Sequence, residues 1–152
     1  MPNDQNITRS WIIPCLRCEK PFKAVKYFVD RGRNRFCSPN CRYRYSVEHP
    51  ELRFWPKVNK AGADECWLWN GYIDCQTGYG IFRYETSTGH GGAHRFSWLL
   101  HNGEIPNDLH VLHKCDVRAC VNPKHLFLGT NYDNIMDMVR KGRNRNGRKC
   151  AR

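Results

Sequence analysis

The residues best suited to chemistry lie between His113 and Asn134, where cysteines and histidines are interleaved with amide side chains. Cys115, Cys120 and His125 recur at five-residue steps, a spacing at which one loop can supply three ligands to a zinc ion. His113 and Asn134 stand outside that set. A histidine can accept a proton near neutral pH, and an amide oxygen suits a hard cation such as magnesium. The stretch therefore predicts a hydrolytic site beside a zinc ion that builds the fold without operating the reaction.

Two strands and a helix would position these side chains. The segment LHVLHKC predicts a strand, and HLFL, after Pro123, predicts the strand that returns beside it. His110 and His113 are separated by an odd number of residues, so they should face opposite sides of the first strand. The order strand, strand, helix, with a metal-binding loop between the strands, is the expected result.

The helix is expected to run from Thr130 to about Lys141. Thr130 and Asp133 form a capping-box-like start, and Gly142 is a suitable stop. Its buried stripe is expected to consist of Ile135, Met138 and Val139. Asn134, in the first turn at the edge of that stripe, would then look across at His113.

Upstream of these elements, residues 66–72 and 79–85 alternate apolar and polar residues around a turn region, which predicts two antiparallel strands. Residues 93–101 predict a helix that ends at Gly103, because Phe96, Leu99 and Leu100 recur at three- and four-residue steps.

The amino-terminal part contains a second set of cysteines with the spacing C-x2-C-x18-C-x3-C, formed by Cys15, Cys18, Cys37 and Cys41. The set predicts a small treble-clef or ribbon-type zinc finger, although four unrelated thiols or a different fourth ligand would also fit. Ser38 and Pro39 predict a helix start at the second cysteine pair. Residues 22–36 predict a short hairpin that turns near Asp30, and residues 1–10 are polar and expected to be loose.

Composition favours two small metal-stabilised modules in a small α+β protein over one large core, because short chains bury limited apolar surface. The expected division is a zinc-finger module at 1–46, a linker at 47–53, a second module at 54–143 and a basic tail at 144–152. Pro50 and Pro56 argue against one continuous helix through the linker.

The net charge indicates a nucleic-acid partner. Lys and Arg number 25 against 14 Asp and Glu, a formal charge of +11, which gives salt-sensitive attraction to phosphates. The alternative is an ordinary solvated charged surface. No apolar signal segment opens the chain and no apolar run is long enough to cross a membrane, so we expect a cytoplasmic protein whose nine cysteines are mainly metal ligands rather than bridges.

The block from Phe54 to Arg143 resembles HNH endonucleases of the His-Me finger superfamily, whose fold is called ββα-metal. The motifs that carry the resemblance are FWPKVNKAG, ECWLWNG, GYGIFRY, AHRFSWLLHNGEIP, VLHKCDVRACVNPKHLFLGT and DNIMDMVRKGR. The resemblance is greatest to the zinc-bearing homing and phage-borne enzymes, and it does not include the first module. It implies a DNA endonuclease that is encoded by a virus or mobile element.

The resemblance also implies roles for individual residues. His113 would be the general base, Asn134 the ligand of a catalytic magnesium ion, and Asn122 a brace for the loop that orients His113. The zinc set would be Cys115, Cys120 and His125 with one upstream cysteine, for which Cys66 is the better match and Cys75 the alternative. Leu112 departs from the pattern, since many relatives carry an acidic metal ligand there, and it implies weak metal binding without DNA.

Arginines would supply the remaining positive charge at the phosphates. Arg83 and Arg95 are candidates for contact with the cleaved phosphate, or for contact with backbone phosphates only. In the first module, DNA contacts are expected from Arg33, Arg35, Arg42 and Arg44. The alternative functions are a catalytically silent zinc protein that binds DNA and, less favoured, a ribonuclease. Cleavage of one strand by a monomer and of both strands by a homodimer both remain open.

Overall fold

The structure is a computed structural model that describes residues 9–84 and 91–143. The chain divides into two compact units, Met1–Leu52 and Arg53–Arg152. The finer division into module, linker and tail stays a prediction. The basic tail at 144–152, with Cys150, and most of the amino-terminal segment predicted to be loose lie outside the described residues. Within the described ranges, no helix has both the length and the apolar character needed to cross a membrane.

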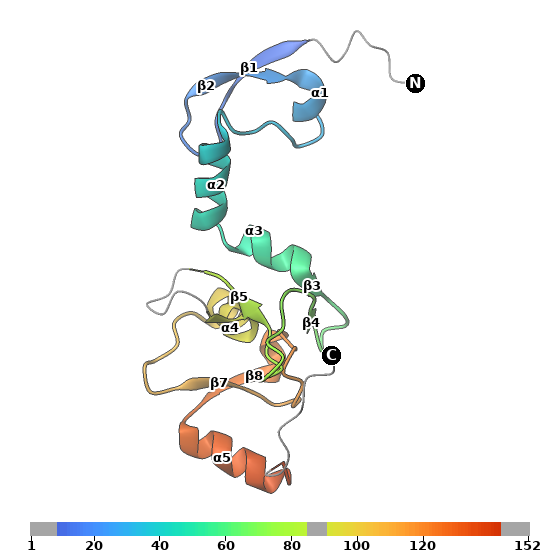
Figure 1. Ribbon diagram of the computed structural model, residues 1–152, viewed down its shortest axis with the longest axis vertical. Helices are drawn as coiled ribbons and strands as arrows, with labels where there is room; N and C mark the ends of the chain where they lie inside the picture. The colour runs from blue at the N-terminus through green and yellow to red at the C-terminus, as the bar shows by residue number, and fades with distance from the viewer. Residues whose placement is uncertain (1–8, 85–90, 144–152) are drawn as a thin grey trace. The chain divides into compact units, whose positions relative to one another are not determined.

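In its described residues before α3 (Glu51–Phe54), the first unit has a two-stranded sheet and two helices (Figure 1). Its elements are β1 (Ser10–Pro14), β2 (Pro21–Val25), α1 (Lys26–Val29) and α2 (Pro39–Glu48). β1 and β2 are antiparallel, with Ser10 opposite Val25 and Pro14 opposite Pro21. The Cys15–Cys18 knuckle therefore forms the connection between the two strands.

The hairpin predicted within residues 22–36 is wrong. Residues 21–25 pair with the preceding segment instead, and α1 begins at Lys26. Strand β1 also includes Ser10, which the sequence assigned to a loose end. The knuckle reverses the chain because the amide of Cys15 donates to the Lys20 carbonyl at 3.0 Å, so the strands on either side of it meet.

The predicted start of the second helix is confirmed. The Ser38 hydroxyl accepts a hydrogen bond from the amide of Cys41 at 3.1 Å, and Pro39 occupies the first turn. This cap satisfies one of the free amides of the first turn. It also fixes the helix start that carries Cys41.

The second unit is built from short elements around an aromatic core. In chain order they are α3 (Glu51–Phe54), which crosses the boundary between the units, η2 (Trp55–Lys57), β3 (Val58–Asn59), β4 (Leu68–Trp69), β5 (Ile81–Phe82), β6 (Gly91–Gly92), α4 (Ala93–Asn102), β7 (His110–His113), η3 (Pro123–His125), β8 (Leu126–Gly129) and α5 (Asn131–Arg140). The core contains Phe54, Trp69, Phe82, Ala93, Phe96 and Val121. Phe54 is central in this core. The centroid of its ring lies 4.9 Å from the ring centroid of Phe96 and 5.2 Å from those of Trp69 and Phe82.

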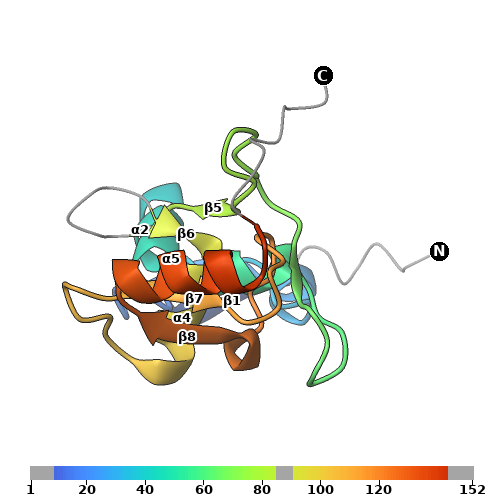
Figure 2. The ribbon, with the colours of Figure 1, turned by 90° about the horizontal axis from the view of Figure 1, so that it is seen from below.

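The predicted strand, strand, helix arrangement is present at the carboxyl-terminal end. β7 and β8 pair antiparallel, with His113 opposite Leu126. In Figure 1 the pair lies between α4 on one side and α5 on the other, and Figure 2 shows α5 in front of the strands. The capping box at Thr130 and Asp133 is complete, and Gly142 has a left-handed φ of 62° beyond the helix end. His110 is exposed and His113 buried, as their odd spacing predicts.

The predicted pairing of residues 66–72 with residues 79–85 is wrong. β4 pairs with β3, and β5 pairs with β6. In the described part of the unit, the two predicted segments are paired only at their inner ends, where the Ile81 amide donates to the Tyr72 carbonyl at 2.8 Å beside an isolated bridge between Ile73 and Gly80. The alternation of apolar and polar residues predicted where strands form but not which segments pair. The partner strands at 58–59 and 91–92 are only two residues long, too short to show such an alternation.

The predicted buried stripe of α5 is also wrong. Ile135 is 46% exposed and Val139 52% exposed, and no residue of α5 is fully buried. The helix contacts β8. Ile135 and Met138 line a pocket that residues of β7 also line, so the stripe borders a hollow instead of a closed core. The helix of residues 93–101, by contrast, is confirmed as α4, and Gly103 follows it with a φ of 83°.

Candidate active site and metal centres

His113 occupies the last position of β7, where its side chain faces the interior. The residue is 8% exposed, and its Nε2 lies 2.9 Å from the carbonyl oxygen of Cys120. A carbonyl can only accept, so Nε2 carries the proton and Nδ1 is left with its lone pair. Burial lowers the pKa of His113 below its usual value, while the Cys120 carbonyl acts in the opposite direction. The imidazole is thus held as a neutral ring with a fixed tautomer.

Asn134 comes from α5 and faces the same hollow. Both Asn134 and His113 line a pocket of about 220 Å³. Its walls also carry Tyr79, Leu112, Asp116, Arg118, Ile135, Asp137, Met138 and Arg143. The pocket thus combines an imidazole, an amide oxygen and two carboxylates with two guanidinium groups. Such a mixture suits a phosphate group held near a hard cation.

The loop between β7 and β8 is fixed to the core by its backbone. The amide of Val121 donates to the Trp67 carbonyl at 2.8 Å, and the Ser97 hydroxyl donates to the Val121 carbonyl at 2.6 Å. Trp69 donates its amide to the Ala119 carbonyl at 2.9 Å. These bonds hold residues 119–121 beside β4. The Cys120 carbonyl that contacts His113 therefore belongs to a segment that is hydrogen-bonded to the core.

Asn122 holds the same loop through its side chain. It is fully buried, and its Nδ2 donates to the carbonyls of Ala63 at 3.0 Å and Glu65 at 2.6 Å. Its Oδ1 accepts from the amide of Lys124 at 3.0 Å and so caps η3. Asn122 does not line the pocket of His113. Asn122 instead links two chain segments. One leads to Cys66 and the other to His125, and both residues are potential metal ligands.

Cys66, Cys115, Cys120 and His125 bring their ligand atoms within 4.8 Å of one another, so the group could hold a metal ion. His125 Nδ1 lies 3.5 Å from Cys66 Sγ and 3.6 Å from Cys120 Sγ. Ligand bonds of zinc in a tetrahedral site imply a sulfur to nitrogen separation of about 3.6 Å. His125 Nε2 lies 3.1 Å from the Asp64 carbonyl, so it carries the proton and leaves Nδ1 for the ion. The four side chains fit zinc, and Cys75, which is exposed, is not among them.

The second group lies in the first unit. Cys15, Cys18, Cys37 and Cys41 also place their sulfurs within 4.8 Å of one another. The Sγ of Cys37 lies 3.6 Å from that of Cys18 and 3.5 Å from that of Cys41. Four thiolates at such separations suit a closed structural site. The chain therefore has two cysteine-rich groups that could bind zinc.

Comparison with known sequences relates part of the second unit to a known family. Residues 92–136 match the sequence model of the HNH endonuclease family. The family match thus places an HNH endonuclease domain at residues 92–136. The matched segment holds His113 and Asn134, together with three residues of the second metal-ligand group.

Two phage proteins resemble the chain over a longer stretch than the HNH domain. Protein 2.8 of Escherichia phage T7 is 38% identical over 95 residues, which is 62% of each chain. Protein 7.7 of the same phage is 36% identical over 89 residues, which is 59% of this chain and 66% of the relative. The match thus spans a little less than two thirds of each relative. No solved structure matches the chain.

Within the HNH domain, His94 was missed by the sequence analysis. Its ring centroid lies 4.9 Å from that of His113 and 5.0 Å from that of Tyr79. Burial lowers the pKa of His94 to about 3, with further lowering by His113 and Arg95. His94 therefore adds no positive charge beside His113. The signal in the sequence is its place in AHRFSWLLHNGEIP, one of the motifs that carry the resemblance, in the first turn of a helix that faces the core.

The arginines at the His113 pocket also differ from the candidates considered from sequence. Arg118 and Arg143 line it, whereas Arg83 lines another pocket, of about 720 Å³, together with Arg53 and Lys57. The Arg118 guanidinium donates from Nη1 to the Thr77 carbonyl at 2.5 Å and lies 5.6 Å from the ring centre of Tyr79. Arg143 is paired with Asp116 and Asp137. Arg118 is thus the pocket arginine without a carboxylate partner among the described residues.

Proposed function

We propose that the chain is a DNA endonuclease that hydrolyses phosphodiester bonds with His113 as general base. The observation that supports this most directly is that His113 and Asn134, from separate elements, line one polar pocket inside an HNH domain. An exposed histidine without such neighbours would give no reason to propose a catalytic role. The strong positive charge of the chain, +11, favours a polyanionic substrate.

The role of His113 follows from its hydrogen bond. Nδ1 takes a proton from the water that attacks phosphorus, while Nε2–H stays bonded to the Cys120 carbonyl and stabilises the positive ring that forms. Because the tautomer is already set, no proton has to move between the ring nitrogens before the reaction. The neighbouring neutral ring of His94 does not oppose that charge.

Asn134 is proposed to hold a magnesium or similar divalent ion against the phosphate. The fit is chemical: the pocket offers the Asn134 amide oxygen and the carboxylates of Asp116 and Asp137, which are the hard ligands such ions prefer. When bound, the ion would supply positive charge for the phosphate and the departing 3′ oxygen. Leu112 adds no ligand, so phosphate oxygens and water would complete the shell.

Arg118 is proposed to contact the cleaved phosphate, since its guanidinium is held at the rim of the same pocket. Arg83, Arg95 and the arginines of the first unit would then contact backbone phosphates, which fix position on DNA without carrying sequence information. Both cysteine-rich groups would hold structural zinc. Thiolate ligands of this kind persist in a reducing compartment, which favours action inside a cell, and the phage relatives fit a virus-encoded enzyme.

The test is cleavage of supercoiled plasmid by the zinc-loaded chain with magnesium. We expect nicked or linear product, and a loss of about a hundredfold or more in His113→Ala and Asn134→Ala. His110→Ala is the matched control, because this histidine lies on the same strand but is exposed on the other face. Omission of magnesium should stop cutting without removing zinc.

One result would reject the proposal in favour of a silent DNA-binding protein. It is a wild-type chain that shifts DNA on a gel but leaves plasmid uncut with every divalent ion tried. Cutting of structured RNA alone would instead favour a ribonuclease. Sedimentation of the chain with a short duplex would show whether it acts as a monomer or a homodimer.

A further inference from the structure

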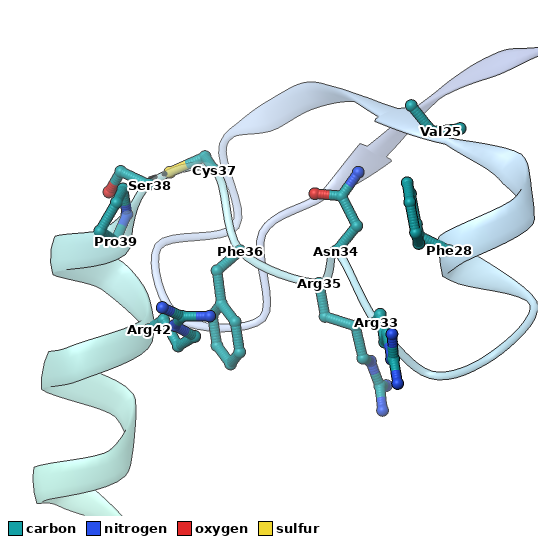
Figure 3. A pocket seen from close by; sticks show the side chains of 10 residues that line it. All are labelled: Val25, Phe28, Arg33, Asn34, Arg35, Phe36, Cys37, Ser38, Pro39 and Arg42. Atoms are coloured by element: carbon teal, nitrogen blue, oxygen red, sulfur yellow. Dashed lines mark hydrogen bonds between the residues drawn. The ribbon is translucent and has the colours of Figure 1, made fainter. Parts of the chain in front are cut away.

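The first unit contains a pocket that the proposed chemistry does not use. It has a volume of about 540 Å³ and lies between α1, the loop at 33–37 and the start of α2 (Figure 3). Pockets that bind small organic ligands have volumes of about 300–1,000 Å³. The pocket is therefore large enough for one nucleotide.

The pocket has a cationic part made by three arginines, Arg33, Arg35 and Arg42. None of its lining residues is acidic, and no ion pair among the described residues neutralises these guanidinium groups. The acidic residues that form ion pairs in the described part of the unit do so elsewhere: Asp30 with Lys26, Glu48 with Arg17, and Glu51 with His49 when that ring is protonated. The charge at the pocket is thus available to an anion.

The pocket also has an apolar part. Val25, Phe28 and Phe36 line it, and Phe28 is 38% exposed although it is a large apolar side chain. Figure 3 shows Phe28 on α1 turned toward the loop that carries the arginines. A duplex presents phosphates at its surface but keeps the faces of its bases stacked inside. An unpaired nucleotide offers both a phosphate and an exposed base face, so it matches both parts of the pocket.

The backbone holds the two parts together. The amide of Arg33 donates to the Phe28 carbonyl at 2.7 Å, which joins the loop to α1. The carbonyl of Arg35 accepts from the amide of Leu16 at 3.0 Å, and the amide of Cys37 lies 3.4 Å from the Cys15 sulfur. The arginine loop is thus attached to the cysteine knuckle. Its shape depends on the same residues that could bind zinc.

We propose that this pocket binds an unpaired nucleotide of DNA, with the phosphate at the arginines and the base against Phe28. The inference rests on the proposed function in taking the ligand to be DNA. It adds that the first unit distinguishes DNA with a locally open strand from fully paired duplex. A protein of this kind would be directed to nicked, frayed or bubbled sites.

The test compares two labelled DNAs of the same sequence, one fully paired and one with an internal unpaired stretch. Fluorescence anisotropy is measured with the full zinc-loaded chain and without magnesium, so that cutting does not intervene. We expect the wild type to bind the open DNA about tenfold more tightly. Arg35→Gln and Arg42→Gln should each reduce that preference and lower the slope of log affinity against log salt by about 0.7. Phe28→Leu should reduce the preference without changing the slope.

Lys23→Gln is the matched control, because it removes one exposed positive charge from the same unit outside the pocket. Zinc content and thermal melting of each variant check that the unit is folded. Equal binding of the two DNAs by the wild type would overturn the inference, as would pocket variants that behave like Lys23→Gln. Plasmid cleavage is measured separately, so a chain that cuts but shows no such preference would reject the pocket alone. A chain that prefers open DNA but never cuts would reject the endonuclease alone.

Discussion

Replacement of Asn122 by alanine should damage both the stability and the metal binding of the second unit. The side chain makes three hydrogen bonds to the backbone, at 2.6, 3.0 and 3.0 Å, from a position with no exposure to solvent. Each such bond contributes about 1 kcal/mol, so the full loss is about 3 kcal/mol. Ala63 and Glu65 are exposed residues whose carbonyls can regain water, which places the expected loss at about 2–3 kcal/mol.

The substitution should also separate the metal ligands. Asn122 ties residues 63–65, which lead to Cys66, to the start of η3, which carries His125. Asn122→Ala should therefore release zinc from the second group at lower chelator concentrations than the wild type. The first group should keep its affinity, because its four cysteines lie in the other unit.

Tryptophan fluorescence during urea unfolding measures the stability change, because four of the five tryptophans lie in the second unit. Chelator titration with a coloured zinc indicator measures the release. Asn107→Ala is the control, since this asparagine is exposed in a turn of the same unit. A loss of stability below about 1 kcal/mol, with zinc release unchanged, would show that Asn122 does not brace the loop.

Other variants test separate parts of the structure. Arg118→Ala should lower the rate of plasmid cleavage about a hundredfold with little change in melting temperature, whereas Arg83→Ala should mainly weaken DNA binding. Cys115→Ser should remove one of two zinc equivalents in metal analysis, and Cys75→Ser should remove none. Hydrogen bonding by Thr130 holds the pKa of Asp133 below its usual value, so Asp133 stabilises α5 above pH about 4 and this contribution is lost as pH falls further. Melting curves of wild type and Asp133→Asn should accordingly converge in acid.

The parts of the fold that sequence predicted well are those set by neighbours in the chain. Ser38 and Thr130 start helices because each side chain reaches an amide three residues later, and Gly103 follows α4 in a conformation that other residues rarely adopt. The pairing of β7 with β8 followed from two apolar runs that flank a metal-ligand loop. Such signals need no knowledge of distant contacts.

The parts that failed depend on partners elsewhere in the chain. β4 pairs with β3 and β5 pairs with β6, although both partner strands are only two residues long. His94 became important only because α4 brings it beside a histidine 19 positions away. Arg118 is similar, since its contact with Thr77 spans 41 positions. No local pattern carries that information, so Arg83 and Arg95 were selected from the sequence by their charge and by the predicted strand and helix that carry them.

The proposed structural ion and the proposed general base are more closely linked than the sequence suggests. Cys120 belongs to both: its sulfur lies in the metal-ligand group, while its carbonyl accepts the hydrogen bond that fixes the tautomer of His113. A bound ion would fix the position of the Cys120 sulfur. Because Cys120 is fully buried and its carbonyl is attached to the same α-carbon, the ion would also restrict the carbonyl. The ion need not touch the substrate to affect the reaction. Loss of zinc from the second group should therefore slow plasmid cleavage before tryptophan fluorescence reports unfolding, because the bond to His113, the proposed general base, is anchored in Cys120 itself.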